Sequence, residues 1–191
     1  VAGGTYTIFV DTYDADAGTF TGSNYNLNKG TNRVYDVEIA SDYNFPAVGA
    51  SPYSVEFLYS CYSSTRDSVV AIGSLDGGAT FTTRKTVATT LGYMRNVSMD
   101  YGRSSSASNG RYFAAWEQLS SSNARNGHIY TSRNMSTVDG DWITPENLDS
   151  LSSSMINLCR NPRIAVQHND IDNDSASVTA IVLVERDYNA D

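Results

Sequence analysis

The chain has 191 residues, of which 40% are hydrophobic, so it can bury a core the size of one globular domain. Its 21 acidic and 13 basic side chains give a formal net charge of −8, which argues against nucleic acid or an anionic membrane surface as a partner. No apolar run approaches the roughly 18 residues of a membrane-spanning helix, so membrane insertion is not expected.

The composition also bears on the compartment. Tyr, Ser, Thr, Asn and Gly are plentiful and Lys is scarce, which we interpret as the surface of an exported protein, secreted or displayed at the cell surface. The first residues lack the basic and apolar regions of a signal peptide, as expected of a mature secreted chain. Cys61 and Cys159 are too few for a disulfide framework. They are interpreted as two buried small hydrophobes, with a single bridge as the alternative.

Runs of β-branched and aromatic residues between polar turns predict strands along the whole chain. The first part contains a strand at residues 5–10, a hairpin at 12–20, a polar loop at 22–32 and an alternating strand at 34–39. Two units of four strands follow, at 45–48, 55–62, 68–74 and 80–86, and then at 95–99, 111–116, 128–132 and 142–143. A last unit has strands at 162–166 and 178–184. Residues 144–158 form either a short helix, begun by Thr144-Pro145-Glu146, or plain loop.

Residues 74–81 read Ser-Leu-Asp-Gly-Gly-Ala-Thr-Phe, a match to the hairpin signature Ser-x-Asp-x-Gly-x-Thr-aromatic. Asp76 can turn its carboxylate onto backbone N–H groups of the turn, and Gly77 and Gly78 can supply the positive φ of a tight hairpin. The signature positions, to which we assign a structural role, are Ser74, Asp76, Gly78, Thr80 and Phe81.

The hairpin recurs at equal intervals. Phe20, Phe81 and Trp142 end three similar segments, and 61 residues separate each aromatic from the next. Residues 12–20 form a degraded copy with one extra residue. Residues 132–142 form another with three extra residues, in which Asn134 stands for the Asp. A fixed period of this length with strand-turn-strand content is typical of propeller blades.

The signature resembles the Asp-box, or BNR repeat, of sialidase-like β-propellers, and the resemblance covers nearly all of the chain. It implies an all-β fold of consecutive four-stranded antiparallel blades. Residues 1–33 would end one blade, 34–90 would form a blade with the intact box, 91–150 a blade with a degenerate box, and 151–191 the start of a further blade. Propellers close with about four to eight blades, so three blades' worth makes an incomplete ring. The expected partner is the remainder of its own propeller or another chain that completes the ring.

The resemblance also implies where catalytic residues would lie. Sialidases bind the substrate carboxylate with three arginines and attack with a Tyr that is paired to a Glu. The family's Phe/Tyr-Arg-Ile-Pro motif is absent, and residues 161–164 share only its Arg-Ile pair. No catalytic set is complete. The candidates for the arginine cluster are Arg95, Arg163 and Arg186, and the alternative is that these three are ordinary surface residues.

Three glutamates and two acidic loops complete the candidates. Glu56, Glu117 and Glu185 each lie in a predicted second strand, which suggests a repeated structural role. No cofactor is expected, although calcium could bind acidic loops, since it takes six to eight oxygen ligands. Solvated turns are the alternative for both loops, whose acidic residues are Asp11, Asp14 and Asp16 in the first and Asp170, Asp172 and Asp174, beside Asn173, in the second.

These features predict a non-catalytic propeller segment that serves as a scaffold or as a protein- or glycan-binding module. The alternative is a fragment of a sialidase-like exo-glycosidase whose catalytic residues lie mostly outside this chain. A third possibility is a module appended to a secreted hydrolase. Fold alone does not separate these functions.

Overall fold

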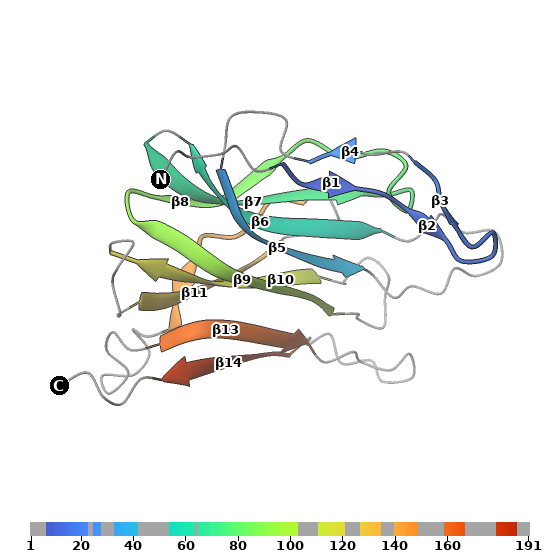
Figure 1. Ribbon diagram of the computed structural model, residues 1–191. Helices are drawn as coiled ribbons and strands as arrows, with labels where there is room; N and C mark the ends of the chain where they lie inside the picture. The colour runs from blue at the N-terminus through green and yellow to red at the C-terminus, as the bar shows by residue number, and fades with distance from the viewer. Residues whose placement is uncertain are drawn as a thin grey trace.

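The computed structural model describes residues 7–22, 25–27, 33–41, 54–63, 65–102, 111–120, 127–134, 140–148, 159–166 and 179–186. These residues form antiparallel sheets only, two of four strands and three of two strands. The prediction of an all-β chain with consecutive four-stranded antiparallel sheets is confirmed, and the described residues do not close a ring (Figure 1).

The strands follow one another along the chain. The first part contains four short strands: β1 (Phe9–Val10), β2 (Tyr13–Asp14), β3 (Thr19–Phe20) and β4 (Tyr25–Asn26). The first large sheet has the order β5 (Arg33–Ser41), β6 (Val55–Ser63), β7 (Arg66–Ser74) and β8 (Lys85–Thr90). The second has the order β9 (Tyr93–Gly102), β10 (Arg111–Leu119), β11 (Gly127–Arg133) and β12 (Glu146–Asn147). The last pair is β13 (Cys159–Val166) and β14 (Ala180–Arg186).

The sheets are stacked face to face (Figure 1). Because side chains alternate along a strand, Phe57 and Tyr59 of β6 pack with residues of the β1–β4 region, whereas Leu58 packs against β9 and β10. The β13–β14 pair lies on the far side of the second sheet, where β13 contacts β9, β10 and β11. Each four-stranded sheet therefore has a neighbour on both faces.

The first strands of consecutive sheets are held together by side chains that accept backbone hydrogen bonds. Ser98 Oγ of β9 accepts from the Ile164 N–H of β13 at 3.2 Å, and Asp100 Oδ2 accepts from the Val166 N–H at 2.8 Å. The carboxylate of Asp36 in β5 likewise accepts from the Val97 N–H of β9. These bonds connect β5, β9 and β13 into one surface.

The three hairpins close in the same way. The N–H groups of Thr21, Thr82 and Ile143, each directly after one of the three periodic aromatics, donate to the carbonyls of Thr12, Gly73 and Arg133 at 2.8, 2.7 and 2.9 Å. Phe9 pairs with Asn26 three residues before Thr12, as Val70 pairs with Thr86 three residues before Gly73. The pair β1–β4 is therefore the counterpart of the third and fourth strands, β7 and β8.

A second repeated feature links the last pair to β9 and β10. Asn96 in β9 and Asn161 in β13 have positive φ values of 51° and 48°, and both lie where the strand register shifts. Their side chains donate to Glu117 at 2.6 Å and to Glu185 at 2.7 Å, on the neighbouring strand. The pair β13–β14 thus corresponds to the first and second strands.

Some sequence-based expectations were wrong. Only two of the three glutamates, Glu117 and Glu185, occupy the same position in their second strands. Glu56 lies opposite Ala40, near the end of β5, and accepts from the Asn134 amide at 3.2 Å. The first strand of the unit with the intact box is Arg33–Ser41, while residues 45–48 lie outside the described residues. Its fourth strand is Lys85–Thr90.

Two further expectations concern the second half of the chain. Glu146–Asn147 pairs with β11 as a strand, so a helix does not begin at Glu146; Leu148 has a 3₁₀ conformation, and residues 149–158 lie outside the described residues. Cys61 and Cys159 are both buried thiols, so the disulfide alternative is wrong.

The Asn96–Glu117 bond gives a first prediction. Asn96→Ala leaves the buried Glu117 carboxylate with one donor fewer and puts an alanine at a left-handed φ, so it should cost about 2–4 kcal/mol of unfolding free energy. Asn96→Gly tolerates the φ and should cost less. Asn161→Ala should also cost less, because its partner Glu185 is exposed. Urea denaturation of the full chain measures all three, and equal losses would contradict this account.

Candidate functional site

The hairpin at residues 74–81 is held by a compact set of hydrogen bonds. Asp76 Oδ1 accepts from the Thr80 N–H and from Ser74 Oγ, both at 2.8 Å, and Asp76 Oδ2 accepts from Thr80 Oγ1 at 2.6 Å. Ser74 Oγ in turn accepts from the Gly78 N–H at 2.7 Å. Gly77 and Gly78 have φ values of 68° and 96°. The hydrogen bonds from Thr80 and Ser74 lower the pKa of Asp76 to about 2.

This network positions Phe81. The Phe81 ring stacks on Tyr25 of β4 with centroids 4.1 Å apart and lies 5.8 Å from the Phe57 ring of β6. The hairpin therefore attaches its own sheet to the preceding β1–β4 pair. This geometry gives the carboxylate of Asp76 a structural role in the turn.

The degraded copies differ from this hairpin. In the first, Asp14 Oδ1 accepts from the N–H groups of Asp16 and Ala17, both at 3.0 Å, as an Asx turn does. In the third, Asn134 directly follows the carbonyl that closes the hairpin, as Ser74 does, so it corresponds to Ser74 and not to Asp76. Its buried amide bonds to the Tyr112 N–H at 3.1 Å and to Glu56.

Of the two sets of calcium candidates, the structure describes only the first, Asp11, Asp14 and Asp16. Asp11 Oδ1 accepts from the Thr12 and Gly22 N–H groups, so this oxygen, like that of Asp14, stabilises the hairpin. Across the described ranges, no group of three or more Asp, Glu, His or Cys side chains could hold a metal ion. The second set, Asp170, Asp172 and Asp174, lies outside the described residues.

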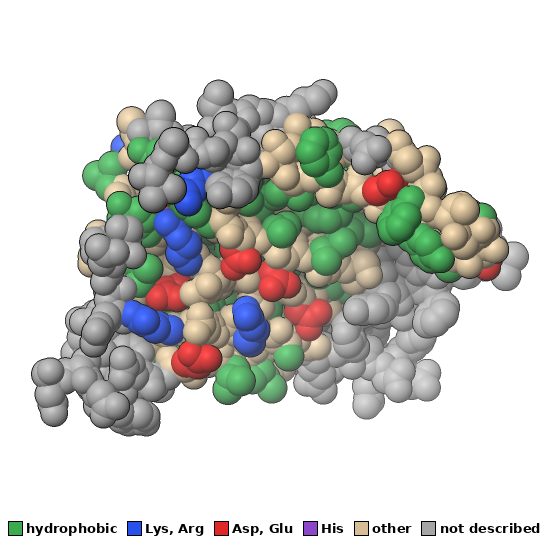
Figure 2. Space-filling model, viewed as in Figure 1, with side chains coloured by type: hydrophobic (Ala, Val, Ile, Leu, Met, Phe, Trp, Pro, Cys, Tyr) green, Lys and Arg blue, Asp and Glu red, His purple; other side chains and the backbone are tan. Residues whose placement is uncertain are grey.

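Acidic and basic side chains gather on the face formed by β5, β9 and β13 (Figure 2). We call it the first-strand surface and define it by Asp36, Glu38, Asp100 and Arg163. Burial raises the pKa of Asp36, and the N–H groups of Val37 and Val97 and the charge of Arg163 offset part of this rise. Burial and the nearby Asp36 raise the pKa of Glu38, again with a partial offset by Arg163. Arg163 is therefore the cation that acts on two half-buried acids of this surface, Asp36 and Glu38.

The three candidate arginines have different surroundings. Arg95 Nη1 lies 2.7 Å from Oδ2 of the buried Asp67, and its guanidinium carbon lies 3.3 Å from the centroid of the Tyr35 ring. Arg163 Nη1 donates to the Pro162 carbonyl at 3.4 Å and belongs to the first-strand surface. Arg186 lies in β14 opposite Cys159, and its side chain is outside the described part. The described side chains therefore give Arg95 and Arg163 separate roles.

Tyr35 is the aromatic residue whose ring lies against Arg95. Burial raises the pKa of Tyr35, the negative charge of Asp67 adds to this, and Arg95 and Arg33 offset part of it. A phenol with a raised pKa stays protonated at neutral pH, which makes it a poor nucleophile.

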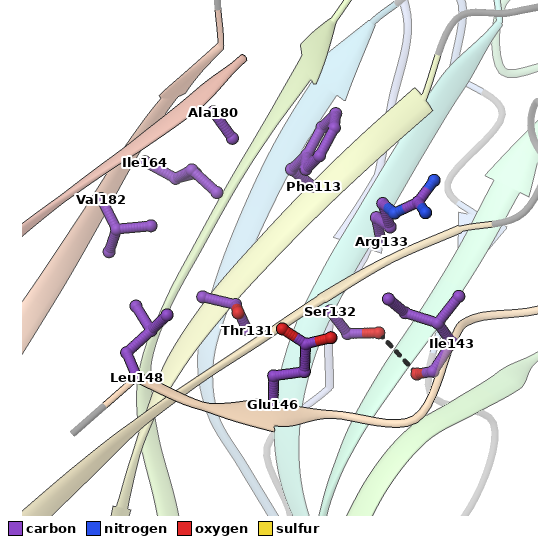
Figure 3. Close-up of a pocket in the computed structure, with 10 residues that line it drawn as sticks. All are labelled: Phe113, Thr131, Ser132, Arg133, Ile143, Glu146, Leu148, Ile164, Ala180 and Val182. Atoms are coloured by element: carbon purple, nitrogen blue, oxygen red, sulfur yellow. Dashed lines mark hydrogen bonds between the residues drawn. The ribbon is translucent and has the colours of Figure 1, made fainter. Parts of the chain in front are cut away.

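A cleft of about 340 Å³ lies between the second sheet and the β13–β14 pair (Figure 3). Phe113, Ile143 and Leu148 line one side, and Ile164, Ala180 and Val182 line the other. Ser132 Oγ donates to the Ile143 carbonyl at 2.8 Å, and Thr131 and the exposed Arg133 and Glu146 complete the lining. The cleft is suited to an apolar side chain more than to a reaction centre.

Sequence reasoning did not find this cleft or the role of Asp67. The residues of the cleft come from five separated segments and carry no motif. The sequence reads Arg-Asn at both repeated bulges, at residues 95–96 and 160–161, a local match that was missed; the same dipeptide also occurs at residues 125–126 and 133–134.

Comparisons with protein-family models, with curated proteins and with solved structures found no match. Among the described residues, no helix has the length and apolar character required to cross a membrane.

The lowered pKa of Asp76 predicts a pH-dependent contribution to stability. A carboxyl group whose folded pKa is about 2, below its usual 3.8, stabilises the fold above pH 4, and this contribution is lost as the pH falls through 2. Asp76→Asn should therefore be less stable than the natural chain at pH 7, and the difference should shrink between pH 4 and pH 2.

Urea denaturation at several pH values measures this difference. Leu75→Asn is the matched control, because it places the same amide on an exposed residue of the same turn without removing a titrating group. A deficit of Asp76→Asn that is independent of pH would show that the charge of Asp76 does not stabilise the hairpin.

Proposed function

We propose that this chain is a non-catalytic segment of a sialidase-like propeller in an exported or cell-surface protein, where it acts as a scaffold and as a protein- or glycan-binding module. The observation that carries the proposal is the first-strand surface. Its side chains lie on three adjacent strands that are connected by hydrogen bonds, so the polar groups are held in fixed positions before a ligand arrives. Preorganised polar groups bind with a smaller loss of entropy.

The chemistry of this surface favours a glycan as the ligand. Glu38 and Arg163 can bond to hydroxyl groups as acceptor and donor, and charged hydrogen bonds are the stronger ones. The net charge of −8 disfavours a polyanion. A neutral oligosaccharide fits both conditions.

The surroundings of the arginines speak for binding over catalysis. A sialidase mechanism requires arginines that are open to the substrate carboxylate and a Tyr that can lose its proton. Here Arg95 is bound by Asp67 and Tyr35, and the pKa of Tyr35 is raised. Hydrolysis of a fluorogenic sialoside by the full chain tests the exo-glycosidase alternative. Turnover that disappears in Arg95→Gln or Tyr35→Phe would overturn the proposal.

Binding of the full chain to an array of neutral and acidic oligosaccharides tests the proposed ligand class. Arg163→Gln should weaken binding to the neutral glycans about 10- to 100-fold, because one hydrogen bond to a charged group contributes about 1.5–3 kcal/mol. Lys85→Gln is the matched control, because Lys85 lies on β8, outside the first-strand surface, where it pairs with Asp141 at 3.1 Å. Equal effects of the two variants, or no glycan bound, would contradict a glycan site on the first-strand surface.

A further inference from the structure

The periodic aromatics provide an internal comparison. Phe81 and Trp142 pack against the hydrophobic clusters that their own sheets share with the preceding strands. Phe20 occupies the same position in the first hairpin, yet 68% of its surface is exposed. Phe9 in β1 is 64% exposed, whereas its counterpart Val70 in β7 is buried. The β1–β4 end of the stack therefore presents side chains that neighbouring sheets cover elsewhere.

The same face continues along β5. Ala40 packs toward β9 and β10, so by alternation Val37 and Ile39 point away from the second sheet, and they are 42% and 58% exposed. The residues of β9 that face the same direction, Val97 and Met99, are buried. Exposed apolar residues in such a row mark an interaction surface.

The opposite end of the stack is also apolar. Ala180 and Val182 of β14 line the cleft, so Ile181 and Leu183 point away from it, and they are 66% and 71% exposed. The counterpart of Leu183 is Ala115, since each lies opposite the residue that follows the bulge, and Ala115 is buried. Within the described residues β14 pairs with β13 and the sheet has no further strand.

The two ends supply complementary halves of one sheet. The pair β13–β14 corresponds to first and second strands, and β1–β4 corresponds to third and fourth strands, as shown by their registers. The two pairs lie at opposite ends of the stack, so they do not meet within one copy (Figure 1). The cleft in Figure 3 lies beside β14. In the complete second sheet, the corresponding place beside the second strand, β10, is occupied by the third strand, β11.

We propose that two copies of this chain assemble head to tail into a closed ring, with β14 of each copy pairing antiparallel with β1 of the other. Each junction then forms a composite sheet of strand order β13, β14, β1 and β4. Phe9 of one copy enters the cleft of the other, and Ile181 and Leu183 cover Val37 and Ile39. Four complete and two composite sheets make a ring of six, within the range of about four to eight for propellers.

The register of the new strand pair follows from the second sheet. Ala115 lies opposite Thr131, which is two residues before Arg133, the residue that closes the third hairpin. Val10 is likewise two residues before Thr12, so Leu183 of one copy should lie opposite Val10 of the other. The inference does not depend on the proposed glycan site, since none of these residues belongs to the first-strand surface.

Sedimentation equilibrium of the full chain over a range of concentrations tests the assembly. The natural chain should show twice the chain mass, and Leu183→Glu should shift it to a single copy, because it places a charge in the apolar junction. Leu91→Glu makes the same change at an exposed leucine away from both ends and should remain a dimer. A natural chain of single mass at all concentrations overturns the proposal, and the uncovered faces would then belong to an interface with other polypeptide.

A disulfide tests the register and the closure. In Val10→Cys/Leu183→Cys, directly opposite residues lie within the Cα separation of about 4.4–6.8 Å that a disulfide spans. The oxidised variant should run as one covalent dimer on a non-reducing gel, and the buried Cys61 and Cys159 should not interfere. A ladder of larger species would show an open head-to-tail chain and overturn the closed ring. No cross-link would overturn the proposed pairing of β14 with β1.

Discussion

A sheet with two apolar faces is stable only between two other layers, and this constraint governs the whole molecule. In the first large sheet, Phe57 and Tyr59 face one way and Leu58 and Val69 the other, and all four are buried. Stacking covers both faces of the inner sheets. The outer faces of the sheets at the two ends of the stack stay uncovered, since every added sheet brings another apolar face. The rows of exposed apolar side chains on β5 and β14 are the direct result.

Polar groups determine how closely the sheets approach and in which register. Ser98 and Asp100 accept the backbone N–H groups of β13, so the first strands are bound side by side. The buried Glu117 receives the Asn96 amide, and Gly127 leaves space for it, because a Cβ there would lie 2.9 Å from Glu117 Oε1. Buried charges contribute little net stability, but an incorrect register would leave them unpaired at a cost of several kcal/mol, roughly 3–5. The bonds of Ser98 and Asp100 therefore specify the stacking that the apolar faces stabilise, and the bond between Asn96 and Glu117 specifies the register of β9 and β10 within one sheet.

The sequence was sufficient to predict the features that repeat locally. Phe20, Phe81 and Trp142 carried the period, and the three hairpins close with the same hydrogen bond. The position of Asn134 was assigned wrongly, because an insertion in the third copy hides which residue follows the closing carbonyl. The role of Glu56 was misjudged because equal spacing along the chain does not ensure equal position along a strand. The pairing of Arg95 with Asp67, and the raised pKa of Asp36 through burial beside β9, depend on contacts between sheets that no local pattern encodes.

Closure of the stack would change what the first-strand surface can bind. In a single copy, the charged side chains of this surface lie on the exposed face that Figure 2 shows. In a ring of six sheets the same strands would face the central axis, and Asp36, Glu38 and Arg163 would line a channel that is accessible only from its two ends. A channel admits a narrow, extended ligand and excludes a folded domain, so assembly and ligand choice are physically coupled. A glycan chain satisfies both the polar chemistry of the surface and the geometry of the ring, whereas a globular protein partner would have to bind at the rim.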